Sequence, residues 1–184
     1  MTILKIDSSI TGDNSVSRIL TERILNQLEP SNRGETVIRR DLVANPLDHL
    51  TLGAFADTQV IDEFLAADTI VIGAPMYNFT LPSQLKAWLD RIIVAGRTFR
   101  YGEDGRPEGL VGDKRVIVAL SRGGYYGADS PAAPLEHLES YLTGTFGFIG
   151  ITPEFVHADG IAVGPAQREA GIANGLLEVE RLAA

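Results

Sequence analysis

Cysteine is absent from this sequence of 184 residues, and histidine occurs only three times. The lack of cysteine excludes a disulfide framework, a catalytic thiolate, an iron–sulfur cluster and the usual cysteine-ligated structural zinc site. No two of the histidines have helical metal-ligand spacing; they are His49, His137 and His157. We therefore expect no metal site.

Long apolar runs and an excess of positive charge are also missing. The longest apolar stretches, residues 69–74 and 116–120, are far shorter than the roughly 20 residues that a membrane span requires. The chain enters a strand-like run at residues 3–6 without a charged and then apolar leader, so we expect a cytoplasmic protein that does not enter a membrane. A formal net charge of −8 argues against a nucleic-acid partner, because binding to phosphate backbones normally needs a basic face.

Short apolar runs alternate along the chain with longer segments of helical period. This pattern is typical of an α/β protein, in which helices cover a parallel sheet. Predicted strands lie at residues 3–7, 36–40, 69–73, 114–120 and 154–158. Predicted helices lie at residues 16–28, 58–67, 81–95, 134–146 and 165–182, and residues 99–112 are expected to form a hairpin or surface excursion. Because no internal repeat or linker interrupts the pattern, residues 1–184 are expected to form one domain.

Five strands that alternate with helices predict an open, doubly wound sheet. Sheets of this kind bind ligands at the carboxyl ends of their strands, where the strand order reverses. The loops after the first, third and fourth strands should therefore meet at one edge. We refer to residues 8–17 as loop one, to residues 74–82 as loop two and to residues 121–127 as loop three.

Loop one is rich in hydroxyl groups and leads directly into a predicted helix. A helix start presents free N–H groups and the positive end of the helix dipole, and the hydroxyls of Ser9, Ser15 and Ser17 add further donors. The loop has no lysine and lacks the spacing of a nucleoside-triphosphate loop, which favours a monophosphate. Helix capping is the alternative for Ser15 or Ser17 alone, but the cluster after a buried strand favours phosphate binding.

Loop two places two aromatic residues and an amide between Pro75 and Pro82. A flat ring such as a flavin needs apolar walls and amide groups at its polar edge. Met76 and Phe79 could form the wall, and Asn78 could make an edge contact. Met76 and Phe79 could equally be ordinary core residues.

Loop three contains the pair Gly123 and Gly124, which lets the backbone approach a planar ligand closely and donate hydrogen bonds to it. Arg122 is either a nearby counter-charge or part of a structural salt bridge. Tyr125 and Tyr126 either cover a ring or line a surface turn. A pair of glycines alone is a weak indication of function, so we interpret the three loops together.

Taken together, these motifs resemble those of the FMN-dependent NADH-azoreductases, also called NADH:quinone oxidoreductases. The resemblance extends over essentially the whole chain. It rests on Ala-Pro-Met-Tyr-Asn-Phe at 74–79 with Gln-Leu-Lys at 84–86, Thr-Phe-Arg-Tyr at 98–101, Ser-Arg-Gly-Gly at 121–124 and Gly-Phe-Ile-Gly-Ile at 147–151. The segment after Gly124, residues 125–131, departs from the loops expected in that family. Because this segment borders the substrate pocket, the departure bears on acceptor preference.

The resemblance implies a flavodoxin-like fold, with a five-stranded parallel sheet of order 2-1-3-4-5 and helices on both faces. It implies FMN as the cofactor, NADH or NADPH as the electron donor, and quinones and azo compounds as acceptors. It also implies a homodimer with each flavin near the subunit interface. The residues implied to bind FMN are Ser9, Ser15, Val16, Ser17, Met76, Tyr77, Asn78, Phe79, Ser121, Arg122, Gly123 and Gly124.

The resemblance further implies a ping-pong cycle, in which the nicotinamide leaves before the acceptor binds over the same face of the flavin. The sequence contains no separate G-x-G-x-x-G dinucleotide motif, which agrees with a shared face. No side chain is obviously a general acid, and the candidate residues around the reaction are Asn78, Gly123, Gly124, Tyr125 and Tyr126. Two alternatives remain, namely a flavodoxin-type electron carrier without small-molecule turnover and a phosphate-binding module without a redox role.

Overall fold

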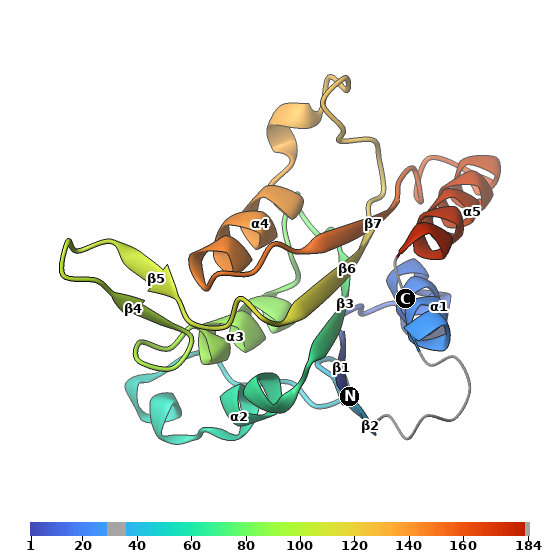
Figure 1. Cartoon of the computed structure of the whole chain (residues 1–184). Coiled ribbons are helices and arrows are strands. Elements are labelled where there is room, and N and C mark those ends of the chain that lie inside the picture. Colours follow the sequence, from blue (N-terminus) through green and yellow to red (C-terminus); the bar gives the residue numbers. More distant parts are fainter. Residues whose placement is uncertain (29–35, 183–184) are drawn as a thin grey trace.

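Five parallel strands form the central sheet of the computed structural model, which describes residues 1–28 and 36–182 (Figure 1). The strands are β1 (Thr2–Asp7), β2 (Thr36–Asp41), β3 (Thr69–Pro75), β6 (Arg115–Ser121) and β7 (Glu154–Ala158). Their order across the sheet is β2-β1-β3-β6-β7. This order confirms the predicted flavodoxin-like sheet, with β6 and β7 as the fourth and fifth of its strands.

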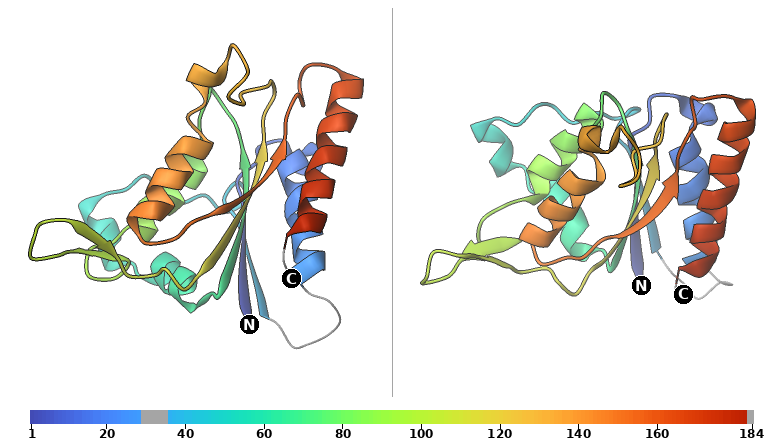
Figure 2. Two further views of the ribbon diagram at one scale, coloured as in Figure 1. Left: turned by 45° about the horizontal axis from the view of Figure 1, so that its top comes forward. Right: turned by 90° about the horizontal axis from the view of Figure 1, so that it is seen from above.

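Helices cover both faces of the sheet (Figure 2). Two of them lie side by side on one face, α1 (Val16–Leu28) and α5 (Pro165–Arg181). The other face carries α2 (Gln59–Ala66), α3 (Ser83–Ile92) and α4 (Glu139–Phe148). Among the described residues, no helix has both the length and the apolar composition that crossing a bilayer requires.

The middle strand β3 is buried over its whole length. Successive side chains of a strand point to opposite faces. Ile70 and Ile72 therefore join the core under α2, α3 and α4, whereas Val71 joins the core under α1 and α5. Burial on both faces explains why this strand is a continuous apolar run in the sequence.

The predicted hairpin lies within residues 99–112. It consists of the antiparallel strands β4 (Phe99–Tyr101) and β5 (Pro107–Gly109), and it projects from the body of the sheet (Figure 1). Within residues 1–28 and 36–182, three short 3-10 helices were not predicted; they are η1 (Gly12–Asn14), η2 (Leu52–Ala56) and η3 (Ala133–Leu135).

The helix predicted at residues 134–146 is wrong at its beginning. Pro134 lies in η3, and α4 starts only at Glu139. The carboxylate of Glu136 accepts hydrogen bonds from the N–H groups of Leu138 and Glu139, at 2.9 and 2.8 Å. A side chain that satisfies the first donors of a helix fixes where the helix begins.

The helix predicted at residues 81–95 is shorter than expected. α3 begins at Ser83, after Pro82, and ends at Ile92. The carbonyl of Ile92 accepts a hydrogen bond from the hydroxyl of Thr98 at 2.7 Å. This bond satisfies a carbonyl that the end of the helix leaves free, so the chain turns there toward β4.

Candidate functional site

Loops one, two and three meet at the carboxyl edge of the sheet. The N–H of Ile10 in loop one donates to the hydroxyl of Tyr77 in loop two at 3.1 Å. The N–H of Met76 in loop two donates to the carbonyl of Ser121 in loop three at 2.8 Å. The expectation that the three loops converge is therefore confirmed.

A cavity of about 470 Å³ opens between these loops. Its volume falls within the range of roughly 300–1,000 Å³ that is common for small-molecule and cofactor sites. The lining residues are Ser9, Thr11, Asn14, Val16, Pro75, Met76, Tyr77, Ser121, Gly123, Ile161, Ala162 and Arg168. The cavity thus joins a hydroxyl-rich end at loop one to a more apolar end at loop two.

The first turn of α1 offers free hydrogen-bond donors to this cavity. The buried hydroxyl of Ser15 caps the helix, because it accepts a hydrogen bond from the N–H of Arg18 at 3.2 Å. It also lies 3.1 Å from the hydroxyl of Ser17. In the described part of the chain, the N–H groups of Val16 and Ser17 have no acceptor. Ser15 therefore caps the helix, while the first N–H donors of the helix remain free.

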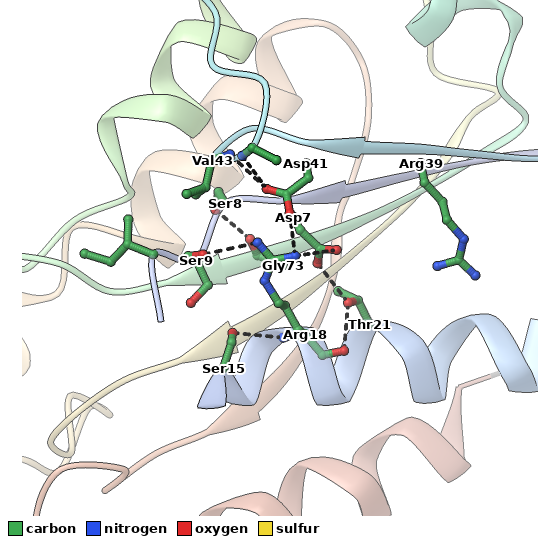
Figure 3. Close-up of polar contacts among 12 residues, drawn as sticks. Asp7, Ser8, Ser9, Ser15, Arg18, Thr21, Arg39, Asp41, Val43 and Gly73 are labelled. Carbon is green, nitrogen blue, oxygen red and sulfur yellow. Dashed lines mark hydrogen bonds and ion pairs between the residues drawn. The ribbon is translucent and has the colours of Figure 1, made fainter. Parts of the chain in front are cut away.

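The side chain of Arg18 connects loop one to the carboxylates of Asp7 and Asp41 (Figure 3). One guanidinium nitrogen lies 2.8 Å from a carboxylate oxygen of Asp41 and 3.5 Å from one of Asp7. A second nitrogen donates to the backbone carbonyl of Ser9 at 3.2 Å. The hydrogen bond from Arg18, together with two backbone N–H donors, lowers the pKa of Asp41 to about 2. The positive charge of Arg18 is thus balanced by carboxylates outside the cavity.

Loop two contains a tight turn with unusual backbone angles. Tyr77 and Thr80 exchange two backbone hydrogen bonds, at 2.9 and 3.1 Å, around Asn78 and Phe79. Both central residues lie in the left-handed region, with φ of 47° and 73°, as a type I′ turn requires. Asparagine tolerates this region, but phenylalanine rarely adopts it, at a cost of about 1–3 kcal/mol. The turn leaves the N–H groups of Asn78 and Phe79 without a backbone acceptor among the described residues.

The side chain of Arg122 forms the structural salt bridge that was one of its two interpretations. It is buried, with Nε 2.6 Å and Nη2 2.8 Å from the two carboxylate oxygens of Asp159. A further nitrogen lies 3.3 Å from Glu139 in α4. The residue is not part of the cavity lining, and its backbone N–H and carbonyl are hydrogen-bonded to Ala158 and Ile161.

The segment after β7 lies against loop three. The N–H groups of Ile161 and Ala162 donate to the carbonyls of Arg122 and Gly123, at 3.1 and 2.9 Å. A Cβ atom at Gly123 would lie only 3.3 Å from the Cβ of Ala162, which explains why glycine suits this close approach. This pairing brings Ile161 and Ala162 to the cavity.

The structure brings the sequence-predicted residues to one place, though not all onto the cavity surface. The predicted residues that line the cavity are Ser9, Val16, Met76, Tyr77, Ser121 and Gly123. Those that lie in the same loops but outside the lining are Ser15, Ser17, Asn78, Phe79, Arg122 and Gly124.

The two tyrosines of loop three have different surroundings. The ring of Tyr126 meets the ring of Phe79 edge to face, with centroids 6.4 Å apart, and so joins loop three to the turn of loop two. Tyr125 lines a separate small hollow beside His157 and Asp159.

Sequence reasoning missed the contribution of the segment after β7. Ile161, Ala162 and Arg168 line the cavity but follow the fifth strand, whose loop was not included. The carboxyl end of that strand lies at the same edge of the sheet as the others, and this alone would have justified including it. Thr11, Asn14 and Pro75 lie within the first two loops but were not selected.

A doubly wound sheet with a cavity at the carboxyl ends of its strands defines a flavodoxin-like α/β protein. In agreement, residues 1–182 match a family described as having a flavodoxin-like fold. FMN-dependent NADH:quinone oxidoreductase 2 of Bradyrhizobium diazoefficiens is 55% identical over 96% of each chain. FMN-dependent NADH:quinone oxidoreductase of Xanthomonas campestris is 46% identical over 99% of each chain.

Azoreductases are among the solved structures that are similar to this chain. An azoreductase from Bacillus anthracis is 29% identical, with a TM-score of 0.87 over 97% of this chain and 96% of the other. An FMN-dependent NADH-azoreductase from the same species, in complex with FMN, is 27% identical, with a TM-score of 0.85 over 98% and 96%. The chain belongs to the family of FMN-dependent NADH:quinone oxidoreductases.

Proposed function

We propose that this protein binds FMN in the cavity between the three loops and uses it to transfer two electrons from NADH to quinones and azo compounds. The observation that carries the proposal is the cavity itself, which has free helix N–H groups near one end and Met76 and Tyr77 of loop two at the other. The names of the relatives and structural neighbours support the cofactor, the donor and both classes of acceptor.

The residues present fit a phosphorylated ring cofactor. At the loop-one end, the N–H groups of Val16 and Ser17 and the hydroxyl of Ser9 suit a phosphate group. At the other end, Met76 and Tyr77 provide walls for a flat ring. A related azoreductase structure is in complex with FMN, which supports the choice of cofactor.

Bound FMN would supply the chemistry of hydride and electron transfer, and the protein would supply positioning and electrostatics. The backbone N–H groups of Gly123 and Gly124 have no acceptor among the described residues, so they are available to the polar edge of the ring. The N–H groups of Asn78 and Phe79, next to the lining residue Tyr77, also have no backbone acceptor among the described residues. Arg122 acts indirectly, because its ion pair with Asp159 fixes the backbone of loop three.

Four finer features belong to the same proposal. The donor and the acceptor use one face of the cofactor in turn, in a ping-pong cycle, and NADPH is an alternative donor. The protein works as a homodimer in the cytoplasm. The absence from the sequence of a separate G-x-G-x-x-G motif supports the shared face.

The test is an absorbance spectrum of the purified protein, followed by addition of NADH without air. We expect a flavin spectrum that bleaches with NADH and returns when a quinone is added. Sustained NADH oxidation with a quinone by the protein alone distinguishes the enzyme from an electron carrier. A colourless preparation that does not bind added FMN would contradict the proposal.

A further inference from the structure

The cavity at the carboxyl edge has an almost uncharged lining in an acidic protein. The net charge of the chain is −8, yet no carboxylate of the described residues lines the cavity. In the part of the chain that the structure describes, the one charged residue of the lining is Arg168, and the rest are hydroxyl, amide, apolar or glycine residues. A ligand placed there meets a single formal charge, and that charge is positive.

The two other arginines near the three loops have their charges balanced already. Arg18 pairs with Asp41 and Asp7, and Arg122 pairs with Asp159 and Glu139. Both guanidinium groups therefore bring little net positive charge to the cavity.

Arg168 differs from both in its partners. It lies in the first turn of α5, and its Nη2 donates to the backbone carbonyl of Asn14 at 2.8 Å. Within residues 1–28 and 36–182 it forms no ion pair with a carboxylate. A guanidinium has five N–H donors, so the bond to Asn14 leaves four for another acceptor.

The contact with Asn14 places the guanidinium at the hydroxyl-rich end of the cavity. Asn14 comes two residues before α1, whose first N–H groups are free. The helix start and Arg168 thus contribute positive potential to the same end, from segments about 150 residues apart in the chain.

We propose that Arg168 is a binding residue for the phosphate group of FMN. The inference rests on the proposed function and adds to it a charged side-chain contact from α5, outside the three loops. A guanidinium pairs with phosphate through parallel, charge-assisted hydrogen bonds, whereas serine hydroxyls and helix N–H groups supply neutral ones. Part of the affinity for FMN is therefore electrostatic and depends on ionic strength.

Comparison of FMN with riboflavin tests this assignment, because riboflavin has the same ring and ribityl chain but no phosphate. The flavin is removed from the full-length protein, and the affinity for each compound is measured by quenching of flavin fluorescence. The variant is Arg168→Gln. The matched control is Arg181→Gln, which removes the same charge from the last turn of the same helix.

We expect R168Q to bind FMN about tenfold more weakly and riboflavin with unchanged affinity. Unchanged riboflavin binding also reports that the cavity keeps its shape. R181Q should bind both compounds as the original protein does. The affinity of the original protein for FMN should fall with added KCl more steeply than that of R168Q.

Equal losses for FMN and riboflavin in R168Q would overturn the proposal, because Arg168 would then only order loop one through Asn14. Unchanged FMN affinity in R168Q would overturn it as well. Neither result touches the proposed function, which is tested separately by FMN binding and by NADH oxidation with a quinone in the original protein.

Discussion

The guanidinium of Arg122 and the carboxylate of Asp159 form a two-point ion pair, with N–O distances of 2.6 and 2.8 Å. The side chain of Arg122 is 5% exposed and that of Asp159 is 25% exposed. The pair connects the end of β6 to the segment after β7, directly next to Gly123 in the cavity lining. It therefore contributes both to folding stability and to the shape of the site.

Substitution of Asp159 by Ala should lower the free energy of unfolding by about 2 kcal/mol. Removing one partner of a fully buried pair typically costs roughly 3–5 kcal/mol, and the loss here is smaller because Asp159 is partly exposed and Glu139 still reaches Arg122. Urea denaturation of the flavin-free protein measures the change. Glu180→Ala is the control, because it breaks an exposed pair with Arg23 and should change stability by less than about 0.5 kcal/mol. Equal effects of the two substitutions would show that the Arg122 pair is not important for folding.

The stability of the protein should depend on the protonation of His157. Its ring lies 3.1 Å from Glu139 on one side and 3.1 Å from Glu178 on the other. Hydrogen bonding to Glu139 raises the pKa of His157 above its ordinary value of 6.5, against the effect of burial, and Glu178 adds to the increase. The stabilisation is thus fully present below about pH 6.5 and is lost as the pH rises through the folded-state pKa.

Unfolding free energies measured from pH 5.5 to 9 test this dependence. We expect the original protein to lose more stability than His157→Gln over this interval. His49→Gln is the control, because His49 is exposed, and it should keep the slope of the original protein. Parallel curves for the original protein and H157Q would contradict the prediction.

Two substitutions at Asn78 separate the contribution of its side chain from that of its backbone. Asn78 lies at a φ of 47°, which glycine adopts freely and alanine does not. If the amide side chain contacts the flavin, Asn78→Gly and Asn78→Ala should both change FMN retention or the flavin reduction potential. If only the turn geometry matters, N78G should retain FMN and N78A should lose stability by about 1 kcal/mol. If FMN retention and the flavin reduction potential are unchanged in both variants, Asn78 does not contribute to the site.

Replacement of Tyr125 and Tyr126 by Ala should alter acceptor preference more than FMN affinity. Tyr126 packs on Phe79 at the turn of loop two, and neither tyrosine is in the cavity lining. An aromatic contact contributes roughly 0.5–1.5 kcal/mol, so the ratio of kcat/KM for a quinone and an azo compound should change about three- to tenfold. Tyr101→Ala, on the exposed hairpin, is the control and should leave this ratio unchanged. Loss of FMN from the double variant would show that loop three has been misassigned.

Local patterns of apolar residues in the sequence predict most of the fold, because the burial of a strand or helix determines which of its positions are apolar. β3 is apolar throughout because both of its faces are covered, and the period of α1 follows from its one buried side. The beginning of α4 was not predictable in the same way. It depends on the carboxylate of Glu136 turning back to cap the helix, which a hydrophobic period does not reveal.

The site was predictable where it depends on single loops and unpredictable where distant segments meet. Hydroxyl groups before α1 and the proline-bounded turn after β3 indicate binding loops from sequence alone. The partner of Arg122 could not be chosen because Asp159 lies 37 residues away. Arg168 was missed for the same reason, since its contact with Asn14 spans 154 residues.

The left-handed turn at Asn78 and Phe79 has a consequence for how a ligand enters the cavity. A short turn with such angles persists only where the packed protein around it excludes the relaxed alternatives, so its shape is set during folding. The loss of conformational entropy has then occurred before any ligand arrives. Association at this edge should consequently involve little rearrangement, with rates close to those of rigid docking and nearly equal geometry before and after binding.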